Sequence, residues 1–328
     1  MIPSVVCMTN TTQVRPPAGT ASRDRGGVRG LIARHPLVSF FTMALGLSWL
    51  AWVPYILSPH GMGVWDIHFP EVLGSGQFTG VLPGALLGPL GSAFIVTAVA
   101  DGRAGLRRWV GRLFRWRVAW YWYALALVVV PALIVVSALP FAGGDVRAPS
   151  ALAFAMLVPG LIIQLFSTGL SEEPGWRDFA LPRLQHRLGA VRGTVVLGLL
   201  WGGWHLPLFL TEWGGFPGVS WTQPVLFIAS CVPLSLVMTW VFNRTGQSVP
   251  LVMLLHAGIN STYTLLWPAV FPTLDAGGDT LVVQLVATTA ATAVLLVVTR
   301  GRLGAPPRGP SATGSSPVPR RDSAALPR

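Results

Sequence analysis

Eight apolar runs, each long enough to cross a membrane as a helix, dominate this sequence. They fall at 37–57, 79–100, 119–141, 152–172, 193–211, 223–243, 249–268 and 281–299. About 30 Å of hydrocarbon takes roughly 20 helical residues to cross. The runs are apolar on all sides, unlike the one-sided stripe of a soluble surface helix. The sequence therefore predicts an all-α fold, a polytopic membrane helical bundle of about eight transmembrane helices.

The composition excludes several other classes of protein. Of 328 residues, 52% are hydrophobic and only 11% are charged, against about 25% charged in soluble domains. A soluble enzyme, a coiled coil and a nucleic-acid-binding domain are disfavoured. The two cysteines, Cys7 and Cys231, are too few for a disulfide framework or a four-ligand zinc site.

The basic residues predict the topology. All 23 are arginine. If the chain crosses the membrane eight times, 22 of them lie on one side of the membrane and only Arg147 lies on the other. The positive-inside rule then predicts that both termini are cytoplasmic. The net charge of +11 is therefore a topology signal, and no nucleic-acid partner is expected. The Arg-rich loop at 103–117 is predicted to lie along the anionic inner leaflet, with RNA binding as the disfavoured alternative.

The domain organisation follows from the same pattern. Residues 1–36 and 300–328 are polar, rich in Arg and, at the C-terminal end, in Pro, Gly and Ser. Both are predicted to be disordered cytoplasmic tails. Residues 37–299 form one transmembrane domain, whose chemistry-bearing motifs lie within 150–265. Neither a short repeat nor an inverted repeat of the transporter kind is evident.

Ionisable groups inside spans are costly and mark candidate functional sites. The first set, Glu172 and Glu173, lies at the end of the fourth span. Arg177 follows Glu173 by four residues, the spacing of an ion pair on one helix face. Glu172 is then free to point elsewhere. Pro174 disfavours a helical Glu173 and predicts that a new helix begins there.

The second and third sets lie in the fifth and seventh spans. His205 follows Trp201-Gly202-Gly203-Trp204 and precedes Pro207, which removes a backbone hydrogen bond and opens the helix. His256 and Asn260 are four residues apart, so both can point at the same place.

Each set also has a purely structural explanation. Glu173 and Arg177 can form a juxtamembrane salt bridge, and His205, His256 and Asn260 can hydrogen-bond between helices. Their coincidence in three otherwise apolar spans favours function. The remaining histidines are predicted to be solvated in tails or loops: His35, His60, His68 and His186.

Together the groups suit activation of a water molecule. In one scheme, Glu172 accepts the proton, His205 orients the water, and His256 with Asn260 stabilises the oxyanion. In the other, Glu172, His205 and His256 hold a divalent metal, with Zn²⁺ as a candidate. Both schemes predict hydrolysis, with peptide bonds as the expected target.

At these three places the sequence resembles the CPBP intramembrane protease family, also called the CAAX protease and bacteriocin-processing (Abi) family. The family is marked by E-E-x-x-x-R, F-x-x-x-H and H-x-x-x-N in that order. The counterparts are Glu172 to Arg177, Trp201 to His205 and His256 to Asn260. Trp201 replaces the family's Phe.

The resemblance implies an intramembrane endopeptidase with a cytosol-facing cavity. By carry-over, Glu172 and His205 are catalytic, and Glu173 and Arg177 support them. His256 and Asn260 bind the oxyanion or a metal, if the enzyme is a metalloprotease rather than a glutamate protease. The expected partners are the bilayer and a peptide or membrane-protein substrate. The Lys-free, Arg-rich usage favours a bacterial cytoplasmic (inner) membrane.

The three sets can converge only if Glu172 lies below the membrane surface. We therefore predict that the fourth span begins later, near 155, and buries both glutamates. The alternatives are a non-proteolytic scaffold or bacteriocin self-immunity protein that uses the same polar cluster structurally, and a transporter with Glu172, His205 and His256 as a proton relay.

Overall fold

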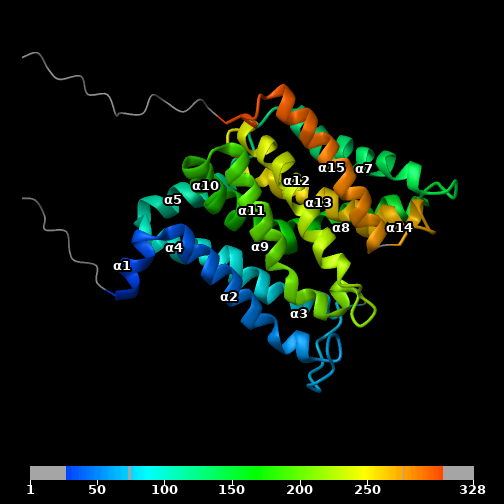
Figure 1. Ribbon diagram of the computed structural model, residues 1–328, viewed down its shortest axis with the longest axis horizontal. Helices are drawn as coiled ribbons and strands as arrows, with labels where there is room; N and C mark the ends of the chain where they lie inside the picture. The colour runs from blue at the N-terminus through cyan, green and yellow to red at the C-terminus, as the bar shows by residue number, and fades with distance from the viewer. Residues whose placement is uncertain (1–26, 73–74, 276, 306–328) are drawn as a thin grey trace, which may run out of the picture.

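The computed structural model describes residues 27–72, 75–275 and 277–305, and within them the fold is a bundle of helices (Figure 1). In these residues eight helical segments are long and apolar enough to cross a membrane. They are Pro36–Leu57, Gln77–Ala100, Trp120–Phe141, Ala151–Leu188, Ala190–Leu210, Thr222–Arg244, Val249–Val270 and Gly278–Val298. The predicted all-α membrane bundle is confirmed.

Several spans contain more than one helical element because π-helical or 3-10 turns interrupt them. The first nine elements are α1 (Gly27–Arg34), α2 (Pro36–Leu57), α3 (Gln77–Ala85), α4 (Ser92–Ala100), α5 (Gly102–Leu113), α6 (Trp120–Ala124), α7 (Val130–Ala138), α8 (Ala151–Gln164) and α9 (Leu170–Glu173). The others are α10 (Leu181–Leu188), α11 (Ala190–Trp204), α12 (Thr222–Arg244), α13 (Val249–Ser261), α14 (Trp267–Val270) and α15 (Gly278–Val298).

The folded region extends further toward the N-terminus than predicted. Residues 27–34, which the sequence analysis placed in a disordered tail, form α1. At the other end, residues 300–305 of the predicted C-terminal tail are also described, and Leu303 is fully buried. Residues 1–26 and 306–328 lie outside the described residues. The cytoplasmic location of both termini stays a prediction.

The fourth span differs from its predicted form. It begins at Ala151, so the expected later start near 155 was wrong, and it stays helical to Leu188. Two π-helical segments, Leu165–Gly169 and Pro174–Ala180, interrupt it. The expected break at Pro174 was also wrong: Glu173 keeps helical dihedrals (φ −63°, ψ −34°). The wider turn accommodates the proline, which lacks a backbone N–H. Both glutamates are therefore carried inside the bundle.

Glycines set the closest contacts between spans. Gly80, Gly84 and Gly88, four residues apart, face α2, where added Cβ atoms would lie 1.8 to 2.2 Å from its Ser48, Trp52 and Tyr55 side chains. In α11, a Cβ at Gly198 or Gly202 would lie 2.8 or 2.9 Å from the α12 backbone. Small residues permit this approach of membrane helices. The close α11–α12 contact holds the helix that ends directly before His205.

The two ends of the bundle differ in charge (Figure 1). One end, here the basic end, carries α1, α5, α10 and the C-terminal end of α15, with most of the described arginines. The opposite or acidic end carries the connections after α2, α7 and α11 and the one before α15. Its described ionisable residues, histidine aside, are Asp66, Glu71, Asp145, Arg147, Glu212, Asp275 and Asp279.

Candidate active site

The two adjacent glutamates of α9 have separate partners. Glu173 is fully buried, and its carboxylate lies 3.3 Å from Arg177 Nε and 2.7 Å from His256 Nδ1. Glu172, which is 5% exposed, instead lines a cavity and accepts a hydrogen bond at 2.7 Å from the indole Nε1 of Trp201. The predicted Glu173–Arg177 ion pair is present, and it leaves Glu172 facing elsewhere.

Arg177 is held on several sides in the interior. Its guanidinium carbon lies 4.2 Å from the centre of the Trp201 ring, a cation–π contact. Nη2 lies 3.4 Å from Ser235 Oγ and 3.1 Å from Met238 Sδ, both on α12. A fully buried arginine needs such compensation for lost hydration. Arg177 thus connects Glu173 to the indole that bonds Glu172.

His205 lies directly after the last residue of α11, where the chain changes to a 3-10 turn over Leu206–Leu210. Its Nδ1 lies 2.9 Å from the Trp201 carbonyl oxygen. A carbonyl only accepts, so Nδ1 carries the hydrogen, and a neutral ring then has its lone pair on Nε2. The ring stacks on Trp213 with centroids 5.4 Å apart. Packing thus constrains the position of the ring, and the hydrogen bond to the Trp201 carbonyl sets its tautomer.

His256 and Asn260 project from successive turns of α13 toward the same cavity. Because a carboxylate accepts, Nδ1 of His256 donates to Glu173, and Nε2 remains for another partner. Asn260 Nδ2 donates to Gln164 Oε1 at 3.3 Å. Thr168 Oγ1 donates to the same oxygen at 2.8 Å. The second N–H of the Asn260 amide stays available.

One cavity of about 770 Å³ joins these groups. Glu172, His205, His256 and Asn260 all line it, together with Trp201, although they come from three different spans. The rest of the wall is largely apolar. It includes Phe78, Leu82, Met156, Ile163, Phe227 and Leu265. The four polar groups predicted to converge therefore line one cavity with a largely apolar wall.

Similarity to known proteins points to the same region. Residues 152–262 match the family described as type II CAAX prenyl endopeptidase Rce1-like. A curated relative, CAAX prenyl protease 2 of Methanococcus maripaludis, is 26% identical over 197 residues, which cover 57% of this chain and 72% of the relative. Over these residues the chain is similar to the CPBP, or CAAX protease, family. The similarity supports intramembrane endopeptidase activity in a multi-pass membrane protein.

The three side chains grouped above as metal ligands do not form a ready site. In the part of the chain that the structure describes, no three His, Cys, Asp or Glu side chains are arranged to hold an ion. The hydrogen bonds to Trp201 and Glu173 use Glu172 Oε2 and Nδ1 of His256, and leave Glu172 Oε1 and Nε2 of His256 for other partners. Metal assistance stays a prediction.

Two residues of the cavity escaped the sequence analysis as site residues. Trp201 was noted only as a replacement for Phe, yet its N–H bonds Glu172 and its carbonyl bonds His205. The available signal was the position of Trp201: its indole carries an N–H donor, and it lies four residues before His205. Gln164 was a polar residue within an apolar span, a signal of the same kind as Asn260.

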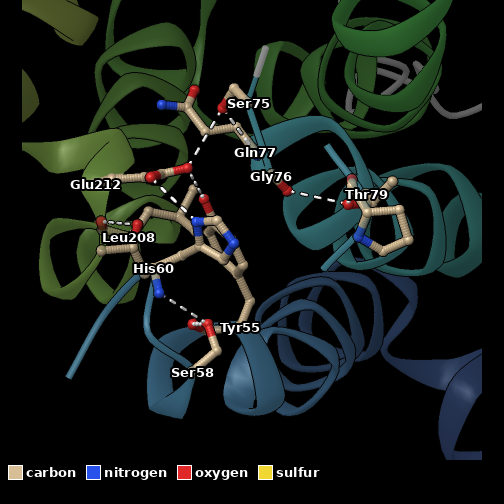
Figure 2. A network of polar contacts seen from close by, with 11 residues as sticks. Tyr55, Ser58, His60, Ser75, Gly76, Gln77, Thr79, Leu208 and Glu212 are labelled. Carbon is tan, nitrogen blue, oxygen red and sulfur yellow. Dashed lines mark hydrogen bonds and ion pairs between the residues drawn. The ribbon is translucent and has the colours of Figure 1, made fainter. Parts of the chain in front are cut away.

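His60 also differs from its predicted state. It was expected to be solvated, but its Nδ1 lies 3.2 Å from Glu212 Oε2 and its ring stacks on Tyr55. Figure 2 shows the network that results: Glu212 Oε1 accepts from the Tyr55 hydroxyl at 2.9 Å and from Ser75 Oγ at 3.3 Å. The network joins the end of α2, the connection before α3 and the turn after α11 at the acidic end.

Proposed function

We propose that this chain hydrolyses peptide bonds of membrane-associated or peptide substrates with a water molecule that Glu172 activates. The observation that carries the proposal is the convergence of Glu172, His205, His256 and Asn260 on one apolar-walled cavity. A buried carboxylate with an imidazole beside it is the arrangement that general-base catalysis uses. Glu173 and Arg177 act as positioning residues behind them.

The first step is attack of water on the scissile carbonyl carbon. The water gives one proton to Glu172 and keeps its other hydrogen bonded to Nε2 of His205, the ring nitrogen that carries the lone pair. Two acceptors thus orient the oxygen toward the carbonyl. The hydrogen bond from Trp201 Nε1 to Glu172 Oε2 leaves Oε1 for the water.

The tetrahedral intermediate carries a negative oxygen that needs donors. The free N–H of Asn260 supplies one, and Nε2 of His256 supplies another when that ring carries both protons. Glu172 then passes its proton to the amide nitrogen, the C–N bond breaks, and an amine and a carboxylic acid leave. Glu173 holds His256 in position throughout.

The test is cleavage of quenched peptides by the purified full chain in detergent. Glu172→Gln and His205→Ala should abolish cleavage, whereas the exposed controls Asp66→Asn and His186→Ala should retain it. Thermal unfolding checks that each variant is folded. Equal activity of wild type and both site variants would overturn the proposal and favour the non-proteolytic scaffold or self-immunity role.

A chelator arm addresses metal assistance separately. Loss of cleavage on chelation, restored by Zn²⁺ or another divalent ion, would assign the reaction to a metalloprotease. Unchanged cleavage would assign it to a glutamate protease. Either result leaves Glu172 at the centre of the proposal.

A further inference from the structure

The cavity extends from the middle of the bundle to the acidic end. The spans Gln77–Ala100, Thr222–Arg244 and Gly278–Val298 begin at that end, and their lining residues reach no further along than Ala85, Leu234 and Gln284. The spans Ala190–Leu210 and Val249–Val270 run toward that end, and their lining residues begin at Trp201 and His256, each within the interior of its span. The wall continues to Val72 and Ser75 in the connection before α3.

The basic end is closed behind the site. Trp176, Arg177 and Phe179, directly after the glutamates, are fully buried. The amphipathic α5 covers this segment, since Trp109 Nε1 donates to the Pro174 carbonyl at 3.1 Å and Arg112 pairs with the buried Asp178. Access to Glu172 from the arginine-bearing face is therefore blocked by packed side chains.

The arginines predict which end of the bundle faces the cytoplasm. The family resemblance implies a cytosol-facing cavity, whereas the distribution of 22 of 23 arginines predicts that the basic end is cytoplasmic. With the cavity toward the opposite end, both expectations cannot hold. Arginine bias is a property of this chain, and it acts directly on insertion.

We propose that the cavity opens toward the non-cytoplasmic side of the membrane, and that its substrates are apolar peptide segments presented from that side. The proposal rests on the proposed function for the cleavage step. The substrate class is then an exported peptide, or the membrane-proximal segment of an exported protein, rather than a cytoplasmic C-terminus.

The mouth of the cavity has the structure and charge for such a substrate. The Glu212 network of Figure 2 holds the connection before α3 against the turn after α11, so the entrance is a formed feature. Glu212 directly precedes Trp213, and the exposed Glu71 directly precedes Val72, both of which line the cavity. Carboxylates beside an apolar cavity favour an apolar segment flanked by basic residues.

Orientation is tested by labelling single cysteines. In a full-length background with Cys7→Ser and Cys231→Ser, Glu71→Cys reports on the mouth and Arg103→Cys on the basic end; both positions are exposed. A membrane-impermeant maleimide should label the Glu71→Cys variant in spheroplasts and the Arg103→Cys variant only after permeabilisation. The reverse pattern, or labelling of both variants in spheroplasts, would overturn the proposal.

The side of cleavage is tested with the wild-type chain in sealed vesicles. An impermeant quenched peptide with an apolar centre and flanking arginines should be cleaved by right-side-out vesicles. Inverted vesicles should cleave it only after detergent is added. The Glu172→Gln variant, prepared in the same way, provides the background. Cleavage confined to sealed inverted vesicles would contradict the proposal.

The two experiments separate this inference from the proposed function. If solubilised wild type shows no cleavage that Glu172→Gln abolishes, the proposed protease function is wrong, and the substrate class fails with it. The labelling pattern then still decides where the cavity opens. If solubilised wild type is active but the labelling is reversed, only the orientation and the exported substrate class are overturned.

Discussion

The basic and acidic ends of this bundle show two uses of polar residues in one apolar chain. At the basic end, acids are paired with arginines, as in Arg112–Asp178 and Arg183–Asp101, and α5 packs over them. At the acidic end, the Glu212 network joins the connections around an open cavity. Paired charges close one end, whereas hydrogen bonds hold the other end in shape without filling it.

The largest expected effect comes from the group that faces the cavity. Glu172→Gln keeps the shape of the side chain and removes its ability to accept a proton, so kcat should fall by about 10²- to 10⁴-fold. Cleavage of a quenched peptide measures this. Retained activity in Glu172→Gln together with loss in Glu173→Gln would reverse the roles given to the two glutamates.

Breaking the buried ion pair should cost stability rather than chemistry alone. Arg177→Met leaves Glu173 without its cation in the interior, a loss of about 3–5 kcal/mol in unfolding free energy. Adding Glu173→Gln should recover part of it. Arg183→Met, which removes a partly exposed pair at the basic end, should cost about 0–1 kcal/mol. Denaturation in detergent measures the unfolding free energy of Arg177→Met, of Arg177→Met with Glu173→Gln, and of Arg183→Met. Equal losses for Arg177→Met and Arg183→Met would contradict the stabilising role given to the buried Glu173–Arg177 pair.

Trp201→Phe tests the indole as a positioning group. Phenylalanine keeps the aromatic packing and removes the donor to Glu172, a hydrogen bond to a charged group worth about 1.5–3 kcal/mol. We expect kcat to fall by about 10- to 100-fold with KM nearly unchanged. Steady-state kinetics separates the two constants. A rise in KM with kcat intact would mean that the indole serves binding.

The smallest effect is expected at the cavity mouth. Glu212→Gln replaces a carboxylate by a weaker acceptor for Tyr55 and His60, a change of about 1 kcal/mol. Because the network lies at the entrance, KM should rise a few-fold while kcat stays the same. Kinetics on the peptides used above measures this. A kcat change as large as that of Trp201→Phe would show that the mouth and the catalytic groups are coupled.

Residue spacing predicted some contacts of the site correctly and others wrongly. The i, i+4 spacing of Glu173 and Arg177 was enough for their ion pair, and that of His256 and Asn260 for their common direction. The same local reasoning failed at Pro174, where a π-helical segment keeps Glu173 helical. It also failed at His60. Its contacts with Glu212 and Tyr55 form between separate segments of the fold, so no residue spacing along one helix predicts them.

The sequence by itself determined the eight spans, the arginine-rich face and the three polar motifs. Those properties depend on hydrophobicity and spacing along one helix. Only the tertiary structure decided that Trp201 bonds Glu172, that His256 bonds Glu173, and that the cavity extends toward the acidic end. These outcomes depend on how residues 172, 201 and 256 pack across three spans, and no local pattern encodes the rotation of one helix against another.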